Sequence, residues 1–388
     1  MEWTCRDALF GRAGRYRGRP HTGPTPLLSE VGEERRVLET FAALRAGTRP
    51  REQRARDREF GGTDGCQRLV RRLIGLAGLG AAFAGAMAVY EQQILIDLAT
   101  TPDPDAGRDF AFPATRAHEI VTPDGGRIHV EECGSGRPVL LLHGHGATLD
   151  TFALLARRLA ECGCRVVAMD QRGFGRSSSV PPTFDLWGLC DDAATVLDAL
   201  GLRRAIVVGH SMGGAVALGL AISRPEILSE HVAGLVLIDS SARGPADRAL
   251  TRARAAALDW AVVERLSRDP RHGIVFARKN FGVDARRSHV AAARAIGFDS
   301  PVRRRRGFAR RLLGIDLTEA LPTIRVPVLA LAGSADRVVP PEGSAEIAAL
   351  IPGARFELLE GAGHMLPMER SAEVAHLIVQ LTAESACV

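Results

Sequence analysis

The sequence predicts an α/β fold, with a mainly parallel sheet that helices cover on both faces and a helical cap inserted into it. Continuous apolar runs, which are typical of strands buried on both faces of a sheet, occur at residues 138–144, 165–170, 205–211, 233–240 and 327–334. Helical patterns separate most of these runs, and that alternation favours parallel pairing. Residues 242–322 hold no comparable strand and are rich in Ala and Arg, so we expect helices there.

The predicted core has two parts, residues 101–241 and 323–388, and the cap of residues 242–322 is inserted between them at one edge of the sheet. The first part opens with a hairpin whose turn is Asp124-Gly125-Gly126. An insertion of this length is too long for a plain loop, so we expect a cap domain. Arg303–Arg306 in the cap could meet acidic substrates or lipid headgroups, although a solvated helix face is the more common explanation.

Residues 1–66 form a basic head that is rich in Arg, Gly and Pro and lacks sustained periodicity. Such a composition cannot bury enough apolar surface to fold, so we expect this head to be disordered. The 388-residue chain has a formal net charge of +5. The sequence has no patch of basic residues interleaved with aromatic residues, so we expect no binding of nucleic acid.

Residues 67–100 are predicted to hold a hydrophobic anchor or signal-like helix and a linker. Within them, residues 73–90 carry no charged side chain and as a helix would span about 27 Å, close to the thickness of the hydrocarbon layer. Because Arg71 and Arg72 precede this segment, we expect a membrane-anchored protein with the folded domain outside the cytoplasm. Two alternatives remain: a signal peptide cleaved at residues 86–88, giving a secreted protein, or a small-residue segment of a cytoplasmic protein.

The stretch 207–216 reads VVGHSMGGAV and surrounds one serine with glycines. It follows an apolar run and leads into a helical pattern, and its centre has the spacing G-x-S-x-G. A sharp turn from strand to helix strains the serine backbone and exposes its hydroxyl at a helix N-terminus, where the helix dipole favours an anion. We interpret Ser211 as a nucleophile rather than as part of a chance Gly-rich turn.

A serine nucleophile needs a base, and the base needs a group that orients it. His364 lies downstream in the loop GAGHMLPMER, and Asp336 lies between them in GSADRVVP, just past a buried strand. Asp239 in VLIDSS also ends a strand and is the alternative acid. We favour Asp336, because it comes from the strand that precedes the strand leading to the histidine.

The oxyanion of a tetrahedral intermediate needs hydrogen-bond donors. The backbone N–H of Met212 follows the nucleophile, and the N–H of His145 is the best candidate in the loop after the first parallel strand. His143 and His145 could instead bind a metal, but a metal site needs a third ligand. The seven cysteines show no metal-binding spacing, so neither a metal nor another cofactor is expected.

Over residues 117–384 the chain resembles the α/β-hydrolase superfamily. The motifs LLLHGHG, DQRGFGRSS, GHSMGG, GSADRVVP and GAGHMLPMER carry this resemblance, in the order that the family has them. The resemblance implies an α/β-hydrolase fold, a catalytic triad of Ser211, Asp336 and His364, and an oxyanion hole at His145 and Met212. It also implies that residues 170–177 brace the sheet on the side of the active site.

We therefore expect a serine hydrolase that cleaves a carboxylic ester of a small or lipid-like molecule through an acyl-enzyme. Dehalogenase and epoxide-hydrolase branches of the superfamily use Asp as the nucleophile, so the serine argues against those reactions. The same triad could hydrolyse C–C bonds, lactones, thioesters or amides, or catalyse perhydrolysis without a cofactor. A non-catalytic binding protein on this fold is the alternative from another class. Association with a membrane through residues 73–90 follows from the predicted anchor, and the sequence predicts no oligomeric state.

Overall fold

The computed structural model describes residues 85–178, 185–244, 265, 268–297 and 314–384. The predicted disordered head, residues 73–84 of the predicted anchor and the Arg303–Arg306 run lie outside these ranges. The chain divides into two compact units, and one of them, residues 10–90, is described only at residues 85–90, which are helical. The other unit contains all the remaining described residues.

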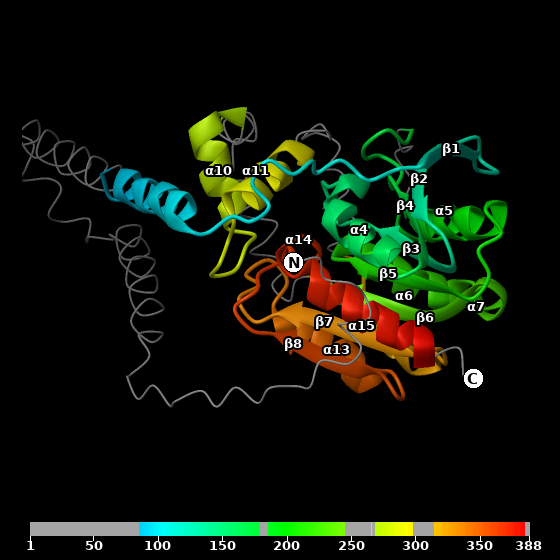
Figure 1. The fold of residues 1–388 in the computed structure, drawn as a ribbon. Helices are drawn as coiled ribbons and strands as arrows, with labels where there is room; N and C mark the ends of the chain where they lie inside the picture. The colour runs from blue at the N-terminus through cyan, green and yellow to red at the C-terminus, as the bar shows by residue number, and fades with distance from the viewer. Residues whose placement is uncertain (1–84, 179–184, 245–264, 266–267, 298–313, 385–388) are drawn as a thin grey trace, which may run out of the picture. The chain divides into compact units, whose positions relative to one another are not determined.

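An eight-stranded sheet forms the centre of this unit, in the order β1-β2-β4-β3-β5-β6-β7-β8 (Figure 1). The strands are β1 (Arg116–Val121), β2 (Arg127–Gly134), β3 (Arg137–Leu142), β4 (Cys164–Met169), β5 (Ala205–His210), β6 (Val232–Ile238), β7 (Val328–Gly333) and β8 (Arg355–Leu359). The β1–β2 and β2–β4 pairs are antiparallel and the others are parallel. The predicted fold class, a mainly parallel sheet with helices, is therefore confirmed.

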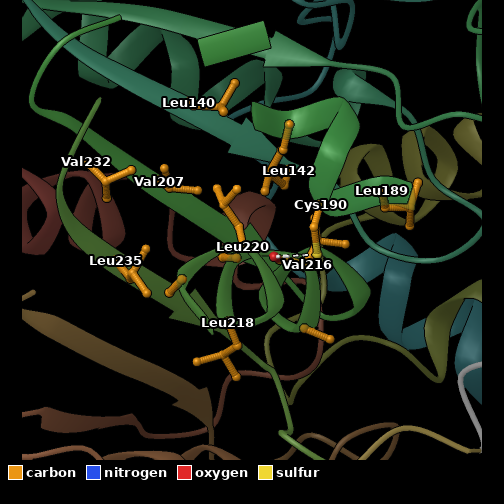
Figure 2. Close-up of a cluster of buried hydrophobic side chains, with 14 of the residues drawn as sticks. Leu140, Leu142, Leu189, Cys190, Val207, Val216, Leu218, Leu220, Val232 and Leu235 are labelled. Carbon is orange, nitrogen blue, oxygen red and sulfur yellow. Dashed lines mark hydrogen bonds between the residues drawn. The ribbon is translucent and has the colours of Figure 1, made fainter. Parts of the chain in front are cut away.

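Helices cover both faces of the sheet, because successive side chains of its central strands point to opposite faces. Leu140 and Leu142 of β3 belong to a core cluster shared with α5 (Leu186–Ala199), α6 (Met212–Ser223) and α13 (Pro341–Leu350). Figure 2 shows this cluster, in which Cys190 of α5 packs beside Val216 of α6. Val139 and Leu141 belong to the opposite cluster.

The opposite cluster is formed with α4 (Ala153–Glu161) and α15 (Ser371–Glu384). The remaining short elements connect these layers: η4 (Leu149–Phe152) precedes α4, α7 (Pro225–His231) precedes β6, η5 (Thr318–Thr323) precedes β7, and α14 (Leu366–Glu369) precedes α15. The loops that carry the candidate site follow the carboxyl ends of the parallel strands.

The cap leaves the core between β6 and β7, and its two ends pair through an antiparallel bridge between Arg243 and Asp316. Its described part includes α10 (Pro270–Arg278) and α11 (Arg287–Ile296). Neither β6 nor β7 is an edge strand, so the expectation that the insertion lies at one sheet edge is wrong. The order of the strands along the chain does not reveal their order across the sheet. β8 comes after the cap in the sequence, and it pairs with β7 and forms the edge of the sheet.

The segment before β1 packs on the cap, a feature that the sequence did not predict. A helix covers residues 85–100, and its buried Ile94 and Leu98 share an apolar cluster with Val290 of α11. Beyond the helix, the Asp105 carboxylate accepts hydrogen bonds from the Arg286 guanidinium at 2.6 Å and from Nε2 of His289 at 2.9 Å. Among the residues that the structure describes, no helix combines the length and the apolar character needed to cross a membrane.

Candidate active site

Ser211 lies at the turn between β5 and α6, with φ 54° and ψ −116°. A positive φ is strained for a residue with a Cβ. The strain is held by the surroundings, since the N–H of Ser211 donates to the carbonyl oxygen of Ile238 at 2.9 Å. The turn holds the hydroxyl at the N-terminus of α6, as the sequence predicts.

The glycines around Ser211 are required by close approaches of the backbone. A Cβ at Gly209 would collide with the carbonyl group of Gly213, and a Cβ at Gly213 would collide with the carbonyl of Leu142. A Cβ at Gly214 would collide with the Ser240 side chain. A side chain at Gly209 or Gly213 would therefore force backbone segments of this turn apart.

Ser211, His364 and Asp336 come from separate loops, and the structure brings them together. Nε2 of His364 lies 3.1 Å from the Ser211 hydroxyl oxygen, and Nδ1 lies 2.7 Å from Oδ2 of Asp336. A carboxylate accepts hydrogen bonds only, so the proton of the neutral imidazole belongs on Nδ1. That tautomer leaves Nε2 with a lone pair facing the serine hydroxyl.

The Asp336 carboxylate is oriented by the start of its own loop. Its Oδ1 accepts hydrogen bonds from the backbone N–H groups of Val338 at 2.7 Å and Val339 at 3.0 Å. The side chain is buried, and these bonds leave Oδ2 to face the imidazole of His364.

Asp239, the alternative acid, has a different environment. Its carboxylate accepts from the N–H of Gly333 at 3.0 Å and from the N–H of Leu366 at 3.4 Å, and Nε2 of His210 lies 3.9 Å from its Oδ2. Full burial, reinforced by the nearby Asp336 carboxylate, raises the pKa of Asp239 well above its usual range. The structure thus places Asp336, and not Asp239, against the imidazole of His364.

His210 is a buried residue of the site that the sequence reasoning missed. Its Nε2–H donates to the carbonyl oxygen of His364 at 2.7 Å. Burial lowers the pKa of His210 to about 3, so the ring is neutral at physiological pH. Donor atoms of His210, Asp239 and His364 lie within 4.8 Å of one another. A metal ion there would compete with the contacts of His364 to Ser211 and Asp336.

The loop after β3 lies beside the nucleophile, because Leu142 of β3 pairs with Gly209 of β5. A Cβ built on Gly144 would be 3.2 Å from the Cβ of Ser211, so the backbone passes close to the serine. The next residue, His145, packs its ring edge-on against Phe174, with ring centroids 5.7 Å apart. The N–H of Met212 is the first amide of α6, where a helix leaves its donors without intrahelical partners.

The pair His143 and His145 is poorly suited to a metal. Nδ1 of His143 donates to the carbonyl oxygen of Gly144 at 2.8 Å, and Nε2 accepts from the N–H of Gln171 at 2.9 Å. Both ring nitrogens of His143 thus already form hydrogen bonds within the protein. The loop of residues 170–177 is tied to the segment after β3, because the buried Asp170 carboxylate accepts a hydrogen bond from the N–H of Leu149 at 2.9 Å.

Other candidate sites among the described residues lack the same chemistry. A cleft of about 510 Å³ lies between α5, the β1–β2 turn and Arg224, but no residue of Ser211, Asp336 or His364 lines it. Arg172 and Asp192, which form an ion pair, are among the residues that line it. The free thiols Cys133, Cys164 and Cys190 are buried, and burial raises the pKa of each, which disfavours a reactive thiolate.

Comparison with known proteins supports a common family. The family model for the alpha/beta hydrolase fold matches residues 137–371. A non-heme haloperoxidase from Rhodococcus erythropolis is 30% identical over 266 residues, which cover 63% of this chain and 92% of that protein. Against two other curated relatives, the matched segment spans only 44% and 21% of their length.

Solved structures show the same similarity. An esterase from Exiguobacterium antarcticum is 26% identical, with a TM-score of 0.60, and the match covers 69% of this chain and all of that one (100%). The structure of a membrane phospholipase A, described as a bacterial virulence factor, is 27% identical with a TM-score of 0.57, and covers 82% of this chain and 99% of that one. The family match, which takes in more than half of the chain, and the observed sheet agree: this protein belongs to the alpha/beta hydrolase fold family.

Proposed function

We propose that this alpha/beta hydrolase cleaves carboxylic esters of small or lipid-like molecules with Ser211, His364 and Asp336. The observation that carries the proposal is the chain of contacts from the Ser211 hydroxyl to Nε2 of His364 at 3.1 Å and from Nδ1 to Asp336 at 2.7 Å. A nucleophile, a base and an orienting carboxylate in this sequence of contacts are the requirements of acyl transfer.

In the first half of the reaction, the Ser211 oxygen attacks the ester carbonyl carbon while Nε2 of His364 takes the hydroxyl proton. The resulting imidazolium is stabilised by the Asp336 carboxylate. The backbone N–H groups of Met212 and His145 donate to the oxyanion. When the intermediate collapses, His364 returns the proton to the leaving alcohol and an acyl-enzyme remains.

In the second half, His364 removes a proton from water, and the hydroxide attacks the acyl carbon. The carbon–oxygen bond to Ser211 breaks, the serine regains its proton from His364, and the carboxylic acid leaves. Segment 280–283 of the cap contacts the loop that carries His364, so we expect the cap to select the acyl and alcohol groups. Similarity to an esterase and to a protein named membrane phospholipase A supports ester substrates, including lipid-like ones.

Perhydrolysis is a second candidate, because the chain resembles a non-heme haloperoxidase over 92% of that protein's length. In this reaction hydrogen peroxide replaces water in the attack on the acyl-enzyme, and a peracid is released. The proton transfers of His364 are the same. No redox cofactor is needed, since the oxidant is the peroxide itself.

A panel of p-nitrophenyl esters of increasing acyl length, with wild type and Ser211→Ala, tests the proposal. We expect turnover by wild type and a loss of about 10⁴-fold or more in Ser211→Ala, because the covalent route is lost. Full activity in Ser211→Ala would refute the mechanism. Absence of turnover with every ester would favour C–C bond, lactone or amide hydrolysis, and peracid formation from acetate and hydrogen peroxide would identify perhydrolysis.

A further inference from the structure

The loop that carries His364 is joined to the cap through direct backbone contacts. The N–H of His364 donates to the carbonyl oxygen of Asn280 at 2.8 Å, and the N–H of Val283 donates to the carbonyl oxygen of Gly361 at 2.8 Å. A Cβ at Gly282 or at Gly363 would collide with the backbone of the other segment. The cap segment 280–283 and the loop 361–364 are thus packed with no side chain between them.

Glu369, at the end of α14, joins the same two segments through its carboxylate. Its Oε2 accepts from the N–H of Gly282 at 2.7 Å. Its Oε1 accepts from the N–H groups of Gly363 at 3.1 Å and Met365 at 3.2 Å, and the N–H of Gly363 also lies 3.2 Å from Oε2. One carboxylate therefore holds one amide of the cap and the amides on either side of His364.

The surroundings of this carboxylate indicate a specific role for it. Burial raises the pKa of Glu369, and the backbone hydrogen bonds oppose that shift. Among the described residues no Arg or Lys side chain forms an ion pair with it, and the adjacent Arg370 is directed to Asp284, at 3.9 Å. The carboxylate of this half-buried residue is thus bound by backbone amides of both segments rather than by a basic side chain.

We propose that Glu369 is a positioning residue that couples the position of the cap to the alignment of His364; this proposal rests on the proposed serine-hydrolase function. Both backbone polar groups of His364 are held by groups outside the triad, the N–H by Asn280 of the cap and the carbonyl by His210. Glu369 fixes the peptides on either side. The ring therefore reaches Ser211 only when segment 280–283 is seated.

Apolar packing supports the same coupling. Phe281 of the cap segment shares a buried cluster with Met365, which precedes α14, and with Met368 of α14. A substrate that displaces or seats the cap will thus move the peptide groups around His364. Because a misplacement of about 1 Å can cost about 100-fold in rate, a small shift is sufficient to change the chemical step.

The test is Glu369→Gln, assayed with a short and a long p-nitrophenyl ester. The glutamine keeps one acceptor oxygen but presents an NH₂ group to backbone donors, so the N–H of either Gly282 or Met365 loses its acceptor, while that of Gly363, which reaches both oxygens, keeps one. The fraction of competent sites is measured first by titrating Ser211 with a fluorophosphonate, so that unfolded protein does not count. We expect kcat per titrated site to fall about 10- to 100-fold with both esters, with KM within about threefold of wild type.

Glu373→Gln is the matched control, because Glu373 is exposed on α15 and undergoes the same chemical change. It should retain wild-type kcat. Glu369→Asp is the second variant, in case the glutamine form yields no folded protein: its carboxylate is one methylene shorter and should lose reach to Gly282, with an intermediate kcat.

A kcat per titrated site within about twofold of wild type in both Glu369 variants would overturn the coupling, as would a loss confined to KM or to the long ester. Those results differ from failure of the proposed function. In that case wild type itself would show no turnover that depends on Ser211.

Discussion

Replacement of Asp336 by Asn tests the assignment of the acid. In wild type, Oδ1 of Asp336 is held by the N–H groups of Val338 and Val339, and Oδ2 faces Nδ1 of His364 at 2.7 Å. Because those N–H groups will select the amide oxygen of the asparagine, its NH₂ group takes the position of Oδ2. A donor then faces Nδ1, which must act as an acceptor, and the imidazole proton moves to Nε2.

That tautomer cannot accept the Ser211 proton, and the imidazolium loses its counter-charge. The expected loss is about 10⁴-fold in kcat, equivalent to about 5 kcal/mol in the activation free energy. The matched control is Asp239→Asn, which changes a carboxylate in the same way at a position that binds Gly333 and Leu366. We expect it to lower kcat by about tenfold or less, since it does not contact the imidazole.

Steady-state hydrolysis of p-nitrophenyl acetate, corrected for the fraction of folded protein by near-UV circular dichroism, measures both variants. The assignment would be refuted by the reverse order, with folded Asp239→Asn inactive and folded Asp336→Asn close to wild type.

Three other predictions follow from the structure. Asp105→Asn should lower the free energy of unfolding by about 3 kcal/mol in urea titrations, because it leaves Arg286 and His289 without their carboxylate; a change below about 0.5 kcal/mol would contradict this packing of the N-terminal segment. The raised pKa of Asp239 means that the folded protein binds a proton more tightly there than the unfolded chain, so this group destabilises the fold as pH rises. Relative to wild type, Asp239→Asn should therefore become more stable as pH rises above the usual pKa of an aspartate, and a difference independent of pH would be inconsistent with that shift. If residues 73–90 anchor the protein, the full chain should sediment with membranes and a form lacking residues 1–90 should not; recovery of the uncleaved full chain wholly in the soluble extract would rule out the anchor.

The sheet could be predicted from the sequence because its parallel strands are buried on both faces and appear as continuous apolar runs. β5, for example, is buried at every position and was expected at 205–211. The nucleophile turn could also be predicted from the sequence, since only glycine tolerates the close backbone contacts at positions 209 and 213. Lateral strand order is not encoded locally, and so the place of the cap within the sheet was assigned wrongly.

The residues that support the site gave no comparable signal. Glu369 appears in the sequence as one charged residue in the loop GAGHMLPMER, and its contact with the cap is made to the backbone amide of Gly282, which is distant in the chain. His210 occupies a variable position of the G-x-S-x-G spacing, and its role depends on the carbonyl of His364. Ile94 and Leu98 lie within residues 67–100, and the sequence does not predict their burial, because two apolar residues do not identify the surface that covers them.

Labelling with a fluorophosphonate, followed by peptide mass spectrometry, tests the central claim most directly. The claim is that Ser211 is activated by His364 across the 3.1 Å contact between the hydroxyl oxygen and Nε2. Wild type should carry one phosphonyl group, located on Ser211, and Asp336→Asn should label much more slowly. An unlabelled wild-type protein that is folded, or a label on any other residue, would contradict the assignment of Ser211 as the nucleophile.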